Sequence, residues 1–266
     1  MLEHGEKIIG GVRFIMKALQ LDHAYIGIED NKMDAVNHLK ELVGGAKDIT
    51  VQALRTRYPQ GAEKQLIQAI TGREVPPGKL PADVGCCVFN AATTAAIYDA
   101  VALGLPVYQR VITITGSAVK NPVNLLAPVG TPFSHLIEEA GGFNGTPARV
   151  ISGGPMMGQA LFSLDIPVMK NSSALTCFVK DEVATSPETP CIRCGRCVEV
   201  CPGHVVPQLM ADAAARHDLA LFEKLNGMEC CECGSCTFIC PAHRPLTQAF
   251  KEMRKAVMAE RRKKKA

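Results

Sequence analysis

The chain has no tryptophan and few aromatic residues, and this scarcity limits what it can bind. Phe, Tyr and Trp together make up 5% of its 266 residues. Proteins that bind single-stranded nucleic acid stack the bases on aromatic side chains. Nucleic acid is therefore not an expected partner.

A long uninterrupted apolar run is also lacking. The most apolar window, residues 84–107, is rich in alanine but contains Asn90 and Asp99, so it predicts a buried helix rather than a membrane span. Met1 leads into a charged amphipathic stretch instead of the apolar segment of a signal peptide. We therefore expect a cytoplasmic protein that meets a membrane only peripherally, through its partners.

The net charge of +3 is spread unevenly. Residues 251–266 form a basic tail with eight Lys or Arg against two Glu, so the rest of the chain is slightly acidic. A basic segment of this kind is typical of contact with an acidic partner or an anionic membrane face. A solvated helix end explains it equally well, and both interpretations stay open.

Periodicity predicts an α+β multidomain protein whose first part, residues 1–106, is an α/β domain. Short apolar runs alternate there with helical spacing of Leu, Ile and Ala. The predicted strands are 24–29 and 49–54, the predicted helices are 63–71 and 91–103, and a further helix is capped by Asp30 or Asn31 and runs to about Leu42.

Residues 107–178 predict a small α+β domain. Strand-like runs occur at 107–115 and 149–152, and a short helix begins with Pro132 at its first position. Gly153–Gly158 resembles a phosphate loop, but no Lys-Ser/Thr follows it and Pro155 removes a donor, so a turn is the better interpretation. A linker at 185–190 follows.

The third domain, residues 185–250, contains the chain's main chemical signal. CIRCGRCVEVCP at 191–202 and CCECGSCTFICP at 230–241 both follow the pattern C-x2-C-x2-C-x3-C-P. In this pattern three closely spaced thiolates bind one [4Fe-4S] cluster, and the fourth cysteine binds the other cluster. The predicted ligands are Cys191, Cys194, Cys197 and Cys240 for one cluster, and Cys230, Cys233, Cys236 and Cys201 for the other.

Other uses of the twelve cysteines are less favoured. Structural zinc needs four ligands but neither a third closely spaced cysteine nor the C-P ending, and disulfides fit poorly without an export signal. Packing accounts for Cys86, Cys87, Cys177 and Cys231, and a capping or surface role accounts for His204 and His243. No Ser/His/Asp or Cys/His set is evident, so we expect single-electron redox chemistry.

Several further segments carry a family resemblance. They are YPQGAEKQL at 58–66, TGREVP at 71–76, LPADVG at 80–85, residues 110–116, GTP at 130–132 and residues 152–158. On these segments and both cysteine motifs, the chain resembles the RnfC family of Rnf-type complexes, membrane assemblies that couple electron transfer between ferredoxin and NAD to ion translocation.

The resemblance implies three domains. Residues 1–106 would be part of a flavin/NADH-binding domain similar to that of the complex I NADH-oxidising subunit. Residues 107–178 would be a soluble-ligand-binding β-grasp (SLBB) domain, and 185–250 a two-cluster ferredoxin-like module. Other subunits of the complex, with ferredoxin or flavin-bearing subunits, are the implied partners, on the cytoplasmic side of the cell membrane.

Possible cofactor sites also follow from the resemblance. FMN and NAD(H) are the implied cofactor and substrate, and the positions carried over for the flavin are Tyr58, Gly61, Glu63, Asn90 and Thr93. Without the resemblance, Glu63 lies in the first turn of a helix, Asn90 and Thr93 could cap another, and Tyr58 belongs to a turn.

One feature of the family is not matched. Its glycine-rich nucleotide loop precedes the part where this chain begins, and Gly10-Gly11 does not fit G-x-G-x-x-G. We therefore expect an incomplete nucleotide site that binds neither FMN nor NADH tightly by itself. As an enzyme, the chain is expected only as a subunit of an NAD:ferredoxin oxidoreductase. A non-catalytic electron-wire subunit and a corrinoid-type flavin/iron–sulfur reductase are the alternatives.

Overall fold

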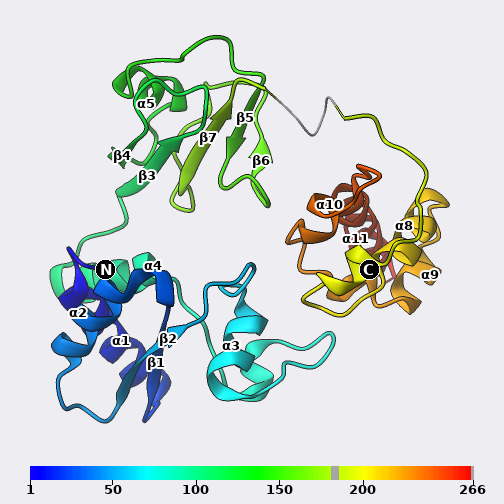
Figure 1. The fold of residues 1–266 in the computed structure, drawn as a ribbon. Helices are drawn as coiled ribbons and strands as arrows, with labels where there is room; N and C mark the ends of the chain where they lie inside the picture. Colours follow the sequence, from blue (N-terminus) through cyan, green and yellow to red (C-terminus); the bar gives the residue numbers. More distant parts are fainter. Residues whose placement is uncertain (181–185, 265–266) are drawn as a thin grey trace. The chain divides into compact units, whose positions relative to one another are not determined.

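Two apolar runs near the start of the chain pair as parallel strands (Figure 1). β1 (Ala24–Glu29) and β2 (Ile49–Leu54) are in register along their whole length. α2 (Met33–Val43) lies in the crossover between them, because parallel strands cannot be joined by a tight turn. The strands predicted at 24–29 and 49–54 are confirmed.

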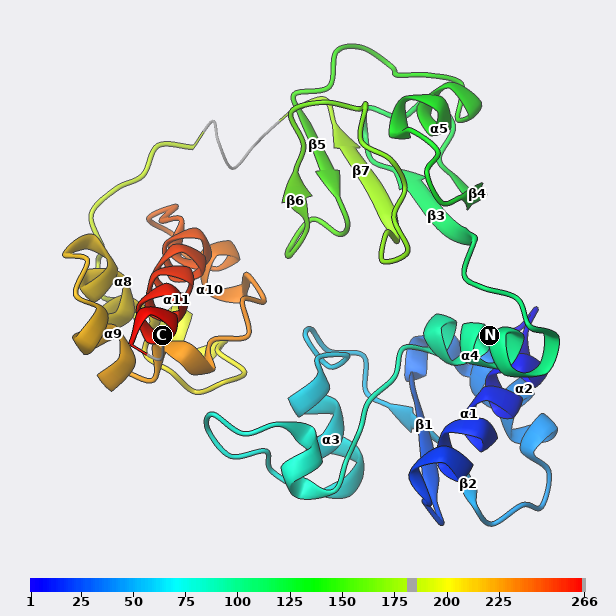
Figure 2. The same ribbon diagram turned by 180° about the vertical axis from the view of Figure 1, so that it is seen from behind.

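The structure is a computed structural model that describes residues 1–180 and 186–264, and Figure 2 shows it from behind. The chain divides into two units, Met1–Val107 and Tyr108–Ala266, each described here by itself. The first residue of the predicted linker at 185–190 and the last two residues of the predicted basic tail lie outside the described residues.

Helices surround the two strands of the first unit. They are α1 (Gly5–Leu19), α2, α3 (Glu63–Thr71) and α4 (Ala91–Leu103), and the last two have their predicted bounds. Side chains of α1, α2 and both strands form the core, with Ile9, Met16, Ile26, Ile28, Val36, Leu39, Val43, Ile49 and Val51 buried in it. Burial of such side chains is the main stabilising contribution to this unit.

Adjacent glycines let α1 approach α4 closely. A Cβ atom at Gly11 would lie 2.0 Å from the carbonyl oxygen of Thr94, and one at Gly10 would lie 2.4 Å from the ring of Tyr98. No real Cβ atom tolerates these distances. The Gly10-Gly11 pair, which fits no nucleotide-binding fingerprint, is therefore a helix-packing feature.

The burial predicted for residues 84–107 is wrong. Thr94 is the one buried residue of α4, whereas Val101 and Leu103 are 62% and 53% exposed. The apolar residues of α4 are distributed around the whole helix, and only the side that meets α1 is packed within the unit. High alanine content indicated the helix correctly but not its burial.

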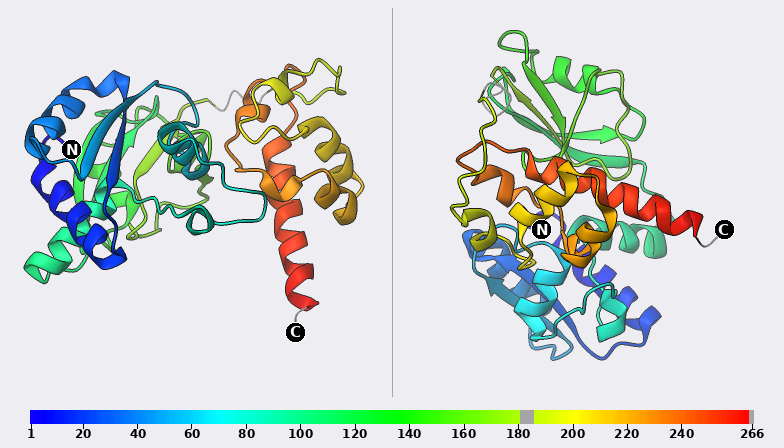
Figure 3. Two further views of the ribbon diagram at one scale, coloured as in Figure 1. Left: turned by 90° about the horizontal axis from the view of Figure 1, so that it is seen from below. Right: turned by 90° about the vertical axis from the view of Figure 1, so that its right-hand side faces the viewer.

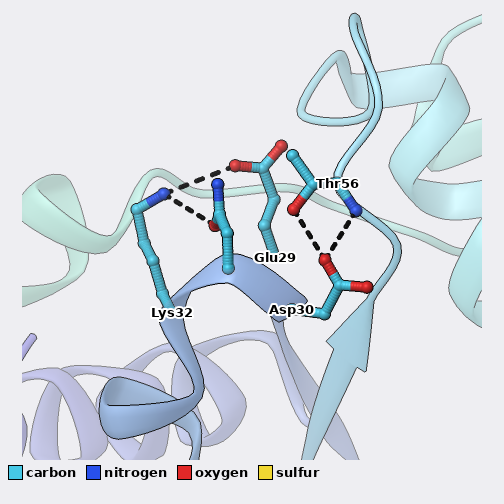
Figure 4. Close-up of polar contacts among 5 residues, drawn as sticks. Glu29, Asp30, Lys32 and Thr56 are labelled. Carbon is cyan, nitrogen blue, oxygen red and sulfur yellow. Dashed lines mark hydrogen bonds and ion pairs between the residues drawn. The ribbon is translucent and has the colours of Figure 1, made fainter.

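Asp30 links the ends of the two strands instead of capping a helix, so the predicted cap is wrong (Figure 4). A 3-10 turn at Asp30–Lys32 follows β1, and α2 begins only at Met33. The Asp30 carboxylate accepts hydrogen bonds from the Thr56 backbone nitrogen at 3.0 Å and hydroxyl at 2.7 Å. Those bonds, the hydroxyl bond foremost, lower the pKa of Asp30.

The second unit begins with a five-stranded mixed sheet. Its strands are β3 (Gln109–Thr115), β4 (Val123–Pro128), β5 (Arg149–Ser152), β6 (Gln159–Ala160) and β7 (Ala174–Phe178), in the order β4-β3-β7-β5-β6. β3 and β7 are parallel and the other pairs antiparallel. Apolar residues of α5 (Phe133–Glu139) pack on one face of this sheet, and Pro132 is the residue before the helix, one position off the prediction.

Five helices make up the cysteine-rich part of this unit. They are α7 (Arg196–Glu199), α8 (Pro207–Ala215), α9 (Leu219–Lys224), α10 (Ser235–Phe238) and α11 (Leu246–Lys263). Phe222 of α9 and Phe250 of α11 meet in their shared core. The end of α11 projects from this core (Figure 3), and Val257 is its last buried residue. No helix in the described residues is both long and apolar enough to span a membrane.

The glycine contact predicts a local loss of stability. Gly11→Ala should lower the opening free energy of α1 by about 1–3 kcal/mol, because the methyl group forces the helices apart by more than the improved helix propensity offsets. Hydrogen exchange of α1 amides measures this. Gly45→Ala is the control, since its Cβ meets nothing within 4 Å; equal protection in both variants would contradict this packing.

Candidate metal centres

The two cysteine motifs fold as a structural repeat, 39 positions apart in the sequence. Gly195 and Gly234 have φ angles of 80° and 86° and precede the short helices α7 and α10. Arg193 and Glu232, inside the loops, have φ angles of 55° and 57°. Left-handed backbone is costly for residues other than glycine, so its recurrence at equivalent positions indicates a shared constraint.

Each motif surrounds a cavity together with the last cysteine of the other motif. The thiols divide into two sets of four, Cys191, Cys194, Cys197 and Cys240 around one cavity and Cys230, Cys233, Cys236 and Cys201 around the other. The structure thus brings together the residues that the sequence assigned to each cluster. Cys231 lies at the second cavity as well.

Backbone N–H groups point at the first thiol of each loop. Arg193 N donates to Cys191 Sγ at 3.4 Å, and Glu232 N donates to Cys230 Sγ at the same distance. Such bonds favour the deprotonated sulfur, which is the form that binds metal. The same interaction at both sites follows from the shared left-handed turn.

Burial differs between the sites. Cys191 and Cys194 are exposed, whereas Cys233 and Cys236 are 7% and 8% exposed. Desolvation raises the pKa of Cys230 to about 11, and a hydrogen bond with Cys231 lowers the pKa of Cys233. A metal that binds the second set must displace protons from buried thiols, so local donors matter more there.

The donor chemistry fits two iron–sulfur cubanes. Four thiols around each cavity, a turn that aims N–H groups at sulfur, and the crossed fourth ligand are the features such clusters require. Within the described residues no group of three or more His, Cys, Asp or Glu is arranged to hold a single metal ion. His204 and His243 are exposed and lie in the turns after the two C-P pairs.

Sequence reasoning missed the hydroxyl groups at the second cavity. Ser235 and Thr247 line it, and Thr237 contacts Thr247. A comparison of the two motifs at their offset of 39 would have found them, since the first motif has Arg196, Gln208 and Val198 at these positions.

The five positions carried over for a flavin are all exposed or only partly buried: Tyr58, Gly61, Glu63, Asn90 and Thr93. The unit's large cavity, of about 570 Å³, is lined by other residues, among them Ile26, Leu66 and Phe89. Asn90 is the N-cap of α4, where its side-chain oxygen accepts a hydrogen bond from Ala92 N at 2.9 Å. Cys86 and Cys87 line the same cavity, while Cys177 is buried in the sheet core.

Comparisons with known proteins agree with this architecture. Residues 1–99 match the Nuo51 FMN-binding domain and residues 111–160 match the SLBB domain. A solved NAD+-reducing [NiFe]-hydrogenase is similar in fold, with a TM-score of 0.61 at 16% identity over 96% of this chain and 51% of that one. The chain is thus an α+β protein that combines an FMN-binding-type domain, an SLBB domain and a cysteine-rich helical part.

Two relatives identify the family. The RnfC subunit of the Na+-translocating ferredoxin:NAD+ oxidoreductase complex of Acetobacterium woodii is 46% identical over 99% of this chain and 59% of its own length. The RnfC subunit of the proton-translocating complex of Clostridium ljungdahlii is 50% identical over 79% and 46%. The chain belongs to the RnfC family, whose members are subunits of ion-translocating ferredoxin:NAD+ oxidoreductase complexes, and it spans about half the length of these relatives.

Capping by Asn90 gives a prediction that is independent of any flavin. Asn90→Ala should destabilise the first turn of α4 by about 1 kcal/mol, because the Ala92 N–H loses its acceptor. Hydrogen exchange of the Ala92 amide measures the loss. Asn90→Asp keeps an acceptor oxygen and should retain protection; equal losses in the two variants would rule the capping role out.

Proposed function

We propose that this chain is the iron–sulfur electron-transfer subunit of a membrane-associated complex that couples electron transfer between ferredoxin and NAD to ion translocation. The observation that carries the proposal is the pairing of each three-cysteine loop with the fourth cysteine of the other motif. The printed activities of the A. woodii and C. ljungdahlii complexes supply the reaction.

Two [4Fe-4S] clusters, when bound, would supply one-electron carriers at these cavities. The thiols of the two sets would hold them, and the backbone N–H groups of Arg193 and Glu232 would stabilise the ligating sulfurs. The loop glycines, Gly195 and Gly234, give the backbone its turn at each site. FMN in the first unit and NAD(H) as substrate are the further cofactors that we propose for the complex.

Partners and position follow from the same proposal. The chain would work with the other subunits of the complex and exchange electrons with ferredoxin or flavin-bearing subunits, peripherally on the cytoplasmic side of the cell membrane. A non-catalytic electron wire is the second candidate, favoured because none of the five carried-over flavin positions is buried. NADH oxidation by the isolated chain with an artificial acceptor separates the two, since a wire cannot perform it.

Iron and sulfide content tests the clusters directly. After anaerobic reconstitution, iron and acid-labile sulfide should each approach about eight per chain, as two cubanes require. The measurement is chemical analysis together with the low-temperature EPR spectrum of the reduced protein. A colourless chain that retains stoichiometric zinc would support structural zinc sites instead.

The crossed arrangement predicts which cluster each cysteine supports. Cys201→Ser should remove the EPR signal that Cys233→Ser removes, since both residues lie at the second cavity. Cys194→Ser should remove the other signal. Cys231→Ala should keep both signals, because Cys231 lies out of phase with the ligand spacing. If Cys201→Ser and Cys194→Ser lose the same signal, the assignment is wrong.

A further inference from the structure

The two cavities differ in the hydroxyl groups near their sulfurs. At the second cavity, Thr247 Oγ1 lies 3.6 Å from Cys236 Sγ, and Ser235 Oγ lies 3.4 Å from Cys233 Sγ. Both sulfurs belong to the predicted ligand set of one cluster. The hydroxyl groups come from the loop itself and from the first turn of α11, so two separate elements supply them.

Thr247 is held in place by further contacts. Its backbone N–H donates to Thr237 Oγ1 at 2.9 Å, and the two threonine hydroxyls are 2.8 Å apart. Thr247 is 8% exposed, so water competes little for its hydroxyl group. Arg254, two turns further along α11, forms an ion pair with Glu232 of the cluster loop. The helix is thus attached to the loop at two points.

Metal ligation fixes the direction of these hydrogen bonds. A thiol could donate to either hydroxyl group, but a ligating thiolate has no proton and can only accept. Thr247 must then donate to Cys236, and the Thr237 hydroxyl is free to donate to Thr247. Burial raises the pKa of Cys236, and the Thr247 hydroxyl is the largest effect that opposes it.

The first cavity lacks this arrangement. The repeat places Gln208 at the position of Thr247, Val198 at that of Thr237 and Arg196 at that of Ser235. Cys197 receives its local hydrogen bond from the Gln208 backbone, which lowers its pKa against a larger effect of burial. The two sites therefore share their thiol geometry but not their side-chain donors.

We propose that Thr247, oriented by Thr237, and Ser235 are tuning residues that raise the reduction potential of the second cluster and make the two clusters unequal carriers. The inference rests on the proposed function, since it requires both clusters. Reduction adds negative charge to a cluster and its sulfurs. Donors aimed at the sulfurs therefore stabilise the reduced form more than the oxidised form.

The test is an EPR-monitored redox titration of the whole reconstituted chain. Thr247→Val should weaken reduction of the second cluster about tenfold, which is about 59 mV to the negative for a one-electron couple. The first cluster should not shift. Thr247→Ser keeps a hydroxyl group and should restore the potential, and Gln208→Leu, at the equivalent position of the first site, should shift neither cluster.

Each outcome decides something. An unchanged potential in Thr247→Val, or equal shifts of both clusters, overturns the inference while two clusters in the unmodified chain still support the proposed function. Fewer than two clusters in the unmodified chain overturn both. Should Thr247→Val lose the second cluster, Thr237→Val decides: it leaves the Thr247 hydroxyl in place without its orienting partner, and an unshifted potential there contradicts the inference.

Discussion

Three thiols from one tight loop and a fourth from elsewhere are the constraint on which the cysteine-rich part depends. Each loop offers three cysteines, and its last cysteine, before proline, lies at the other cavity. Neither site is complete without both motifs. The contacts of α8 with α11 and the core around Phe222 and Phe250 therefore serve the sites directly, because they hold the two motifs together.

The repeat is symmetric in backbone and asymmetric in side chains. Equivalent left-handed residues and equivalent N–H bonds to sulfur occur in both loops. Burial and hydroxyl donors distinguish the second site from the first, where Cys191 and Cys194 are exposed. Potentials of such clusters respond to exposure and to hydrogen bonds at sulfur. A duplicated motif can in this way provide two carriers that differ in potential.

The sequence predicted what depends on local spacing and failed where distant contacts decide. Both strands of the first unit and helices α3 and α4 have their predicted bounds, because their apolar patterns are continuous. Asp30 has the residue type of a helix cap, but Thr56, 26 positions away, takes its carboxylate. The ligand cysteines could be grouped because the C-x3-C-P ending fixes the crossed pairing, whereas the contact of Thr247 with Cys236 depends on how α11 packs, which no local pattern reveals.

The most direct measurement of the central claim is anomalous diffraction at the iron absorption edge from crystals of the reconstituted chain. The account predicts two iron peaks of equal occupancy. One should be bounded by Cys240 and the three thiols of the first loop, and the other by Cys201 and the three thiols of the second. Iron bound with Cys201 and the first loop's own thiols, or anomalous signal at the zinc edge alone, would contradict the account.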